Sequence, residues 1–162
     1  MSNNVIVLAG GLSHERDVSL RSGRRVAQAL RETGHTVVEA DINASLIGTI
    51  RALEDPVVFP VLHGGAGEDG ALREVFDLLD VAYVGSTGSA SQIAFDKAVM
   101  TPTVAKAGLR TPPQSALPTD MFRELGAGNL VGALASKIGF PMMVKPARSG
   151  SALGSAKVDD AA

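Results

Sequence analysis

Two short apolar runs, each followed at once by a glycine-rich loop and then by a helical pattern, constrain the fold of this chain most. Val5–Ala9 and Pro56–Val61 are continuous apolar stretches of strand length, as found in parallel strands that are covered on both faces. After the second run, apolar residues recur from Leu72 to Leu79 at i, i+3, i+4 and i+7, which indicates one face of a helix. This order predicts an α/β fold with a parallel sheet and right-handed crossovers.

The segments around these runs predict the rest of an open parallel sheet. Gly34 follows a helical stretch that begins near Glu15, and glycine is common just past the end of a helix. Further apolar runs separated by turn residues continue the alternation of strand and helix as far as Gly88. The predicted helices here are 15–32 and 45–53 in addition to the one after Gly70, and the other predicted strands are 36–39 and 81–84.

A second unit is predicted after residue 88. A helical stretch over 90–107 contains Pro102, which must kink or interrupt it, and Thr111–Pro113 forms a linker. The later segments predict a strand at 114–117, a helix at 129–138, and a hairpin with strands at 141–145 and 155–158. Because so few strands cannot bury both faces of a sheet, we expect this unit either to pack on the first domain or to be the front part of a longer protein.

The composition excludes several classes of protein. Hydrophobic residues make up 45% of the sequence, charged residues 20%, and the formal net charge is −2, so no basic surplus points to nucleic acid. No apolar run approaches the roughly 20 residues of a membrane span. The sequence has no cysteine, which excludes disulfides and thiolate metal sites. Its start lacks the features of a signal peptide, so we expect a cytoplasmic protein.

Three glycine-rich loops follow predicted strands, at Gly10–Glu15, His63–Gly70 and Arg148–Gly154. Ligands of open α/β sheets bind at the carboxyl ends of the strands, and backbone N–H groups in such loops suit anions. None of the loops has the spacing of the dinucleotide fingerprint or of the P-loop. Asp41, just past the second strand, stands where a ribose-binding acid would lie in a dinucleotide fold, but the fingerprint that would support this role is absent.

Single residues in these segments have a structural interpretation beside a functional one. Glu15, at a helix start, would gain about 0.3–1 kcal/mol from the helix dipole, and Asp69 is placed to cap the helix after it. A histidine that follows a buried strand, as His63 does, is commonly a satisfied structural group. Lys145 ends an apolar strand and suits either a phosphate contact or solvent, and Lys97 lies in a helix where lysines are usually solvated.

Four segments in order along the chain have the form of short motifs. Gly10–Leu20 matches G-G-x-S-x-E-x-x-V-S-L, and His63–Gly70 matches H-G-x-x-G-E-D-G. Asp96–Lys97 and Val144–Pro146 each present a lysine, and Gly150–Ser151 follows the second of these. In this order and at this spacing they resemble the D-alanine–D-alanine ligase family of ATP-grasp ligases, over the whole chain.

The resemblance implies an enzyme that joins two D-alanines at the expense of ATP for peptidoglycan precursor synthesis. ATP phosphorylates the carboxylate of the first D-alanine, and the amine of the second attacks the acyl phosphate. Residues 1–88 are then a substrate-binding domain that is Rossmann-like, 89–113 a helix and linker, and 114–162 an incomplete ATP-grasp subdomain. The alternatives are a D-alanine–D-lactate ligase, another ATP-grasp carboxylate–amine ligase, or a non-catalytic ligand-binding fragment.

The resemblance also implies roles for single residues. Glu15 would bind the ammonium of the first D-alanine, His63 would line the D-alanine pocket, and Ser151 would link the loop that covers the phosphates to Glu15. Glu15 and Ser151 are thus the implied catalytic residues. The implied ATP-binding residues are Lys97, Lys145, Gly150 and Ser151.

The implied cofactors are ATP and Mg²⁺, and the implied assembly is a homodimer with no nucleic-acid or membrane partner. No metal ligands are identifiable in the sequence, so we expect them beyond Ala162, and we expect these 162 residues alone to be inactive. The sequence departs from the family pattern at two positions. Ala152 replaces a usual serine, and Pro102 lies in the helix after Lys97.

Overall fold

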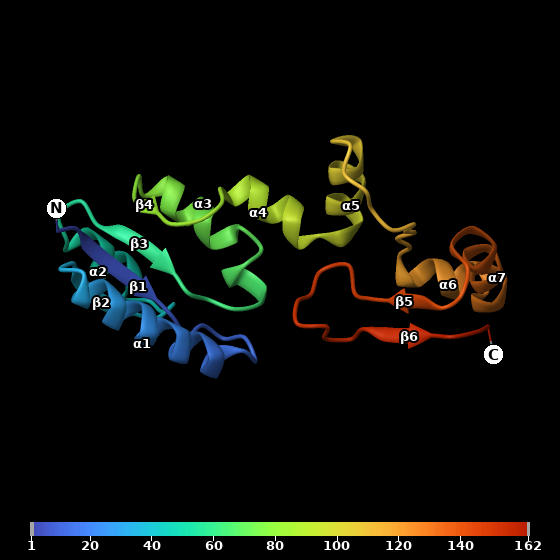
Figure 1. The fold of residues 1–162 in the computed structure, drawn as a ribbon, viewed down its shortest axis with the longest axis horizontal. Helices are drawn as coiled ribbons and strands as arrows, with labels where there is room; N and C mark the ends of the chain where they lie inside the picture. The colour runs from blue at the N-terminus through green and yellow to red at the C-terminus, as the bar shows by residue number, and fades with distance from the viewer. Residues whose placement is uncertain (1, 162) are drawn as a thin grey trace. The chain divides into compact units, whose positions relative to one another are not determined.

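The computed structural model describes residues 2–161, which belong to two compact units, Met1–Gln92 and Ile93–Ala162. The first unit contains an open four-stranded parallel sheet, and the second contains a two-stranded antiparallel hairpin with helices (Figure 1). The predicted α/β class with an open parallel sheet is therefore confirmed. The finer domain limits of 1–88, 89–113 and 114–162 stay a prediction.

The sheet of the first unit has the order β2-β1-β3-β4, and each neighbouring pair is parallel. The central strand β1 (Asn4–Leu8) pairs with β2 (Thr36–Ala40) on one side and with β3 (Val57–Pro60) on the other. The short strand β4 (Ala82–Tyr83) pairs with β3 at the edge. Because the strands are parallel, the loops that follow β1, β2 and β3 gather at one edge of the sheet.

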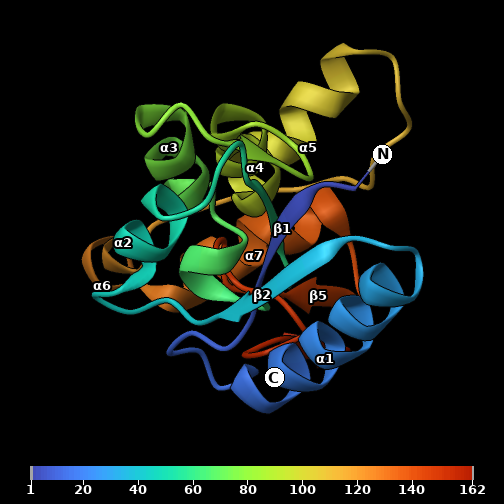
Figure 2. The ribbon, with the colours of Figure 1, turned by 90° about the vertical axis from the view of Figure 1, so that its left-hand side faces the viewer.

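Alternate residues of β1 supply the two cores of this unit. Ile6 and Leu8 pack with Phe76 in one cluster, which α2 and α3 cover, whereas Val5 and Val7 pack with residues of α1 in the other. Figure 2 shows α1 on one side of the sheet and α2 and α3 on the other. The continuous apolar run in the sequence thus reflects burial on both faces. The helices are α1 (Arg16–Glu32), α2 (Leu46–Arg51) and α3 (Ala71–Leu78), and α4 (Gly88–Phe95) begins in this unit and ends in the second.

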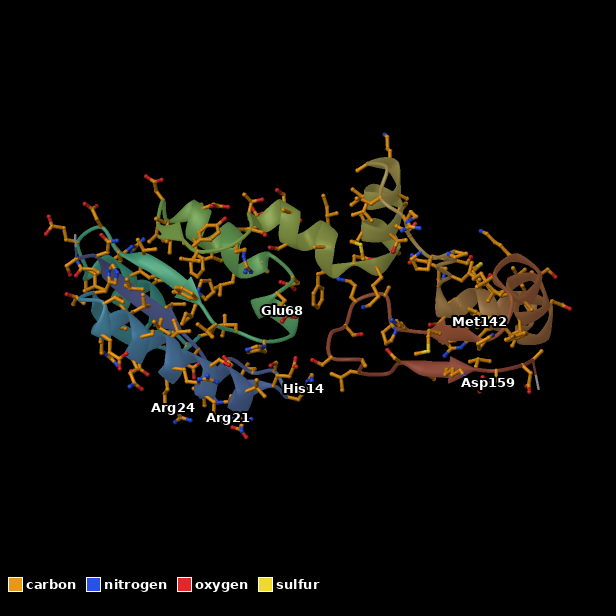
Figure 3. All side chains as sticks on the ribbon, viewed as in Figure 1. His14, Arg21, Arg24, Glu68, Met142 and Asp159 are labelled. Atoms are coloured by element: carbon orange, nitrogen blue, oxygen red, sulfur yellow. The ribbon has the colours of Figure 1, made fainter. Side chains whose placement is uncertain are left out.

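The second unit confirms the predicted hairpin. Strands β5 (Met142–Val144) and β6 (Ala156–Val158) pair antiparallel, with Met142 opposite Val158. Met142 and Asp159, at the same end of this hairpin, are labelled in Figure 3. Among the described residues of this unit none is fully buried, so the hairpin and its helices leave apolar surface uncovered. The helices are α5 (Lys97–Lys106), α6 (Thr119–Leu125) and α7 (Ala127–Ile138).

The predicted helix over 90–107 is interrupted, but Pro102 is not the cause. The break lies at Asp96, whose backbone is extended (φ −97°, ψ 107°) and forms an isolated antiparallel bridge with Arg148. The Asp96 carboxylate accepts a hydrogen bond from the N–H of Ala98, so it caps the second segment as a new helix. Pro102 lies inside that helix.

The prediction of a strand at 114–117 was wrong, and α6 was not predicted. Residues 109–118 form no regular element, and the side-chain amide of Gln114 donates to the carbonyl of Lys97 instead of joining a sheet. Helix α6 has seven residues, which is too short for an apolar period to show in the sequence. In the part of the chain that the structure describes, no helix is both long and apolar enough to cross a membrane.

Replacing Phe76 by alanine tests the first core. The ring is fully buried and lies 5.6 Å from the ring of Tyr83, so Phe76→Ala is expected to lower the free energy of unfolding by about 3–5 kcal/mol. The matched control is Leu78→Ala on the same helix, because Leu78 is 85% exposed; its effect is expected to stay within about 0.5 kcal/mol. Urea denaturation measures both variants, and equal losses would contradict the placement of the core.

Candidate functional site

The carboxyl edge of the parallel sheet brings together residues that are far apart in the sequence. The loop after β1 leads through Gly10 into α1, Asp41 follows β2, and the loop after β3 begins near His63. His14 and Glu68, which come from the first and third of these loops, lie at the same end of the first unit (Figure 3). Two of the three predicted glycine-rich loops are therefore neighbours.

The Glu15 carboxylate lies against the backbone of the loop after β3. Glu15 is at the N-cap position of α1, but its side chain makes no capping hydrogen bond to the helix. A Cβ atom built on Gly64 would be 2.7 Å from Glu15 Oε2, so this close approach requires glycine, and the φ of +72° at Gly64 also favours glycine. The Glu15 side chain is only 17% exposed, and His14 Nε2 is 3.9 Å from its carboxylate. The structure thus brings Glu15 and His63 to one place, while their ligand stays a prediction.

Two serines that sequence reasoning left without a role join these loops. Ser13 Oγ donates to the carbonyl of His63 at 2.6 Å and accepts from the N–H of Glu15 at 3.2 Å. The fully buried Ser19 Oγ donates to the carbonyl of Val61 at 2.6 Å and accepts from the N–H of Gly10 at 2.8 Å. The available signal was the row of small residues in α1 at a spacing of four, which are its buried residues: Ser19, Gly23 and Ala27.

Asp41 serves the first loop and is not arranged for a ribose. Its Oδ1 atom accepts from the N–H groups of Gly11 and Ile42, each at 2.7 Å, and its Oδ2 atom lies 2.6 Å from Arg16 Nη2. Burial alone would raise the pKa of Asp41, but the hydrogen bonds from Arg16 and the two backbone N–H groups outweigh it and hold the pKa below its ordinary value. Asp41 therefore stays ionised at neutral pH, with both oxygens engaged by the chain.

The end of the H-G-x-x-G-E-D-G segment leads directly into helix α3. Asp69 Oδ1 accepts from the N–H of Ala71, the first residue of α3, at 3.0 Å. Asp69 thus has a structural role at the helix start, but the N-cap residue of α3 is Gly70 and not Asp69. Glu68 is exposed beside it.

In the second unit, Lys97 is tied to the third glycine-rich loop. It is the first residue of α5, its Nζ donates to the carbonyl of Ser149 at 2.6 Å, and its N–H donates to the carbonyl of Ala147 at 3.0 Å. The guanidinium carbon of Arg148 lies 5.9 Å from the centroid of the Phe95 ring. Lys97 is half-buried and held, so the interpretation of it as a solvated helix lysine was wrong.

The loop after Lys145 is a tight turn with unusual backbone angles. Ser151 and Ala152 have φ values of +50° and +58°, a region that side-chain-bearing residues seldom adopt. The N–H of Leu153 donates to the carbonyl of Gly150 at 3.1 Å, which closes the turn. Lys145 itself is exposed at the end of β5, and Ser151 belongs to the second unit whereas Glu15 belongs to the first. The roles expected for Lys145, Gly150 and Ser151 therefore stay predictions.

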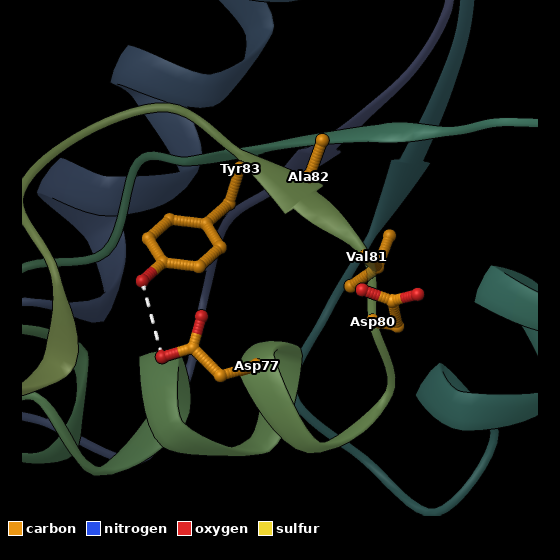
Figure 4. Close-up of a pocket in the computed structure, with 5 residues that line it drawn as sticks. All are labelled: Asp77, Asp80, Val81, Ala82 and Tyr83. Carbon is orange, nitrogen blue, oxygen red and sulfur yellow. Dashed lines mark hydrogen bonds between the residues drawn. The ribbon is translucent and has the colours of Figure 1, made fainter.

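A surface pocket of the first unit, at the start of β4, does not include Glu15, Asp41 or His63. It is lined by acidic and apolar side chains, and Tyr83 donates to Asp77 Oδ2 at 3.4 Å (Figure 4). Burial, and then Asp77, raise the pKa of Tyr83. Because β4 begins here, the pocket is at the amino edge of the sheet, and we do not assign it a ligand. Within residues 2–161, no group of three or more His, Cys, Asp or Glu side chains could hold a metal ion.

Known proteins are similar to this chain in sequence and in fold. A family model described as D-ala D-ala ligase N-terminus matches residues 39–86. A D-alanine–D-alanine ligase from Desulforudis audaxviator is 40% identical over 156 residues, which are 95% of this chain and 48% of that protein. The chain therefore spans about half the length of the curated relatives it matches.

Two solved structures give the same result. The VanG D-Ala:D-Ser ligase from Enterococcus faecalis superposes with a TM-score of 0.77 at 25% identity, over 99% of this chain and 56% of that one. A D-alanine–D-alanine ligase from Bacillus anthracis complexed with ATP superposes with a TM-score of 0.71 at 26% identity, over 98% of this chain and 51% of that one.

Removal of the Ser19 hydroxyl tests how the loops are joined. Ser19→Ala leaves the Gly10 N–H and the Val61 carbonyl without this partner in a buried place, so the free energy of unfolding is expected to fall by about 1–3 kcal/mol. Ser22→Ala on the same helix is the control and is expected to change it by less than about 0.5 kcal/mol. Guanidinium denaturation gives both values, and a neutral Ser19→Ala would show that the two backbone groups find other partners.

Proposed function

Because this chain belongs to the D-alanine–D-alanine ligase family, over the N-terminal half of its members, we propose that it supplies the first D-alanine site and part of the ATP site of such a ligase. The observation that carries the proposal is the Glu15 carboxylate held beside His63 and Gly64 at the carboxyl edge of the sheet. An amino-acid substrate presents a cation and an anion, and this edge offers a carboxylate together with accessible backbone.

The first unit binds the ammonium group of D-alanine in this proposal. Glu15 is mostly shielded from water, so a charge-assisted hydrogen bond from an ammonium to its carboxylate is strong. Because Gly64 has no side chain, the Glu15 carboxylate can lie directly against the backbone of the loop after β3. The half-buried His63 lines the same place. Ser13 and Ser19 hold the two loops together and so keep Glu15 in position.

The second unit contributes cations and backbone N–H groups to phosphoryl transfer. The γ-phosphoryl group leaves ADP and bonds to a carboxylate oxygen of the first D-alanine, which makes the acyl phosphate. The amine of the second D-alanine then attacks the carbonyl carbon, loses its proton, and displaces phosphate. Positive charges stabilise the charge that develops on the transferred group. Lys97 and Lys145 provide such charges, and Gly150 and Ser151 belong to the loop that covers the phosphates.

Lys97 has donors to spare for this role. An ammonium group has three N–H donors, and the Ser149 carbonyl accepts one from Lys97 Nζ. The contact aims the amine at the segment that begins the glycine-rich loop, and its remaining donors suit phosphate oxygens. Mg²⁺ is part of the proposal as a cofactor, but residues 2–161 present no ligand cluster for it, so we assign it no step.

The proposal also covers the acceptor substrate, the oligomeric state and the cellular location of the reaction. The similarity to a D-Ala:D-Ser ligase makes D-serine a second acceptor to test beside D-alanine and D-lactate. Glu15 and His63 serve the first D-alanine in every case, so the choice of acceptor does not depend on them. The proposal also includes a homodimer that supplies peptidoglycan precursors, and it places the protein in the cytoplasm because the reaction consumes ATP.

Substitution of Glu15 tests the function in the whole protein. Glu15→Gln is nearly isosteric but removes the negative charge, so the KM for the first D-alanine is expected to rise at least about tenfold, which corresponds to ~1.4 kcal/mol. Phosphate release at varied D-alanine with ATP and Mg²⁺ gives the KM, and the melting temperature checks the fold. Asp17→Asn is the control, because it removes another carboxylate from the first turn of α1 and is expected to leave the KM unchanged.

Two results would overturn this assignment. An unchanged KM with a lowered melting temperature would return Glu15 to the helix-dipole role. A whole wild-type protein that releases no phosphate in the presence of D-alanine would contradict the proposed function itself.

A further inference from the structure

Asp41, Arg16 and Gly11 form a closed ring of hydrogen bonds at the carboxyl edge of the sheet. Asp41 Oδ1 accepts from the Gly11 N–H at 2.7 Å, and Arg16 Nη1 donates to the Gly11 carbonyl at 2.8 Å. Arg16 Nη2 and Asp41 Oδ2, 2.6 Å apart, complete the ring. The backbone of Gly11 is therefore held at both its N–H and its carbonyl, by groups from the end of β2 and the start of α1.

The residue before Gly11 shows how closely Asp41 is fitted to this loop. Gly10 has a φ of +109°, and a Cβ atom built there would be only 2.4 Å from Asp41 Oδ1. The carboxylate thus occupies the space that a side chain at position 10 would need. The N–H of Gly10 is bonded to Ser19 on the other side.

The ring restricts the backbone position of the segment that carries Glu15. Arg16 follows Glu15 directly, and its own N–H donates to the carbonyl of Ser13 at 3.1 Å. The N–H of Glu15 donates to Ser13 Oγ at 3.2 Å. With Gly11 and Arg16 joined to each other and to Asp41, the segment that carries Glu15 is closed at both ends. The ring therefore ties together the two ends of the segment that carries Glu15.

We propose that Asp41 and Arg16 are positioning residues for substrate binding, which act by fixing the loop that carries Glu15. This inference rests on the proposed binding of D-alanine by Glu15. The side chains of Arg16 and Asp41 are 45% and 26% exposed, and ion pairs near the surface add little stability. Loss of the pair is therefore expected to appear in substrate binding more than in folding.

The chain contains a matched ion pair without a loop contact. Arg31 and Glu39 also join α1 to β2, at 2.9 Å, and their side chains are 48% and 44% exposed. Besides Glu39, Arg31 donates to the carbonyl of Val37. Within the described residues, the hydrogen bonds of this pair thus do not involve residues 10–15. Removal of this pair controls for the loss of an arginine–carboxylate contact between α1 and the β2 region.

Kinetics of the whole protein test the inference. Asp41→Asn removes the charge that holds Arg16, so the KM for the first D-alanine is expected to rise about three- to tenfold, with kcat and the KM for ATP within about twofold of wild type. Arg16→Lys keeps the charge but loses the fork that spans Gly11 and Asp41, and a smaller rise is expected. Glu39→Gln is expected to leave all three constants within about twofold of wild type.

A double variant separates positioning from general damage. If Asp41 acts through Glu15, the rise in the KM for D-alanine that Asp41→Asn causes is smaller when Glu15 is already glutamine than in the wild-type background. Equal effects in the two backgrounds, or the same KM in Asp41→Asn and Glu39→Gln, would overturn the inference. Should Asp41→Asn fail to fold, Arg16→Lys alone and combined with Glu15→Gln gives the same comparison. A wild-type protein without D-alanine-dependent activity would instead contradict the proposed function.

Discussion

Backbone polar groups that the sheet leaves unpaired at its carboxyl edge constrain this protein most. β1 is buried on both faces. The backbone that directly follows it is therefore shielded from water, and its N–H and carbonyl groups need partners within the protein. Side chains meet that need: Ser19 pairs with Gly10 and Val61, Asp41 with Gly11, and Ser13 with His63. The same contacts that satisfy the backbone hold two loops at a fixed separation.

The position of Glu15 is a consequence of this arrangement. Its carboxylate is held at a helix start without a capping bond, next to a glycine that leaves room for it. A carboxylate in a place poor in water favours a partner with positive charge, which is what an amino-acid ammonium offers. The structural contacts and the proposed chemistry therefore rest on the same few residues.

The second unit follows the same principle with a lysine. Lys97 donates from both its backbone and its side chain to carbonyls that lead into the glycine-rich loop, and Asp96 breaks the preceding helix to make this possible. The break places a cation at the base of a tight turn. In the described part of this unit no residue is fully buried, so local hydrogen bonds rather than a core define this loop.

The sequence by itself determined the alternation of strand and helix, the parallel sheet, the glycine-rich loops and the family motifs, because apolar periodicity and turn residues act locally. It did not reveal the break at Asp96, the short α6, or the roles of Ser19 and of the Asp41–Arg16 pair. Those depend on partners that lie far away in the chain, as Asp41 lies 30 residues from Gly11 and Ser19 lies 42 from Val61. Only the tertiary structure decides which backbone groups are left without a partner, and hence which side chains must serve them.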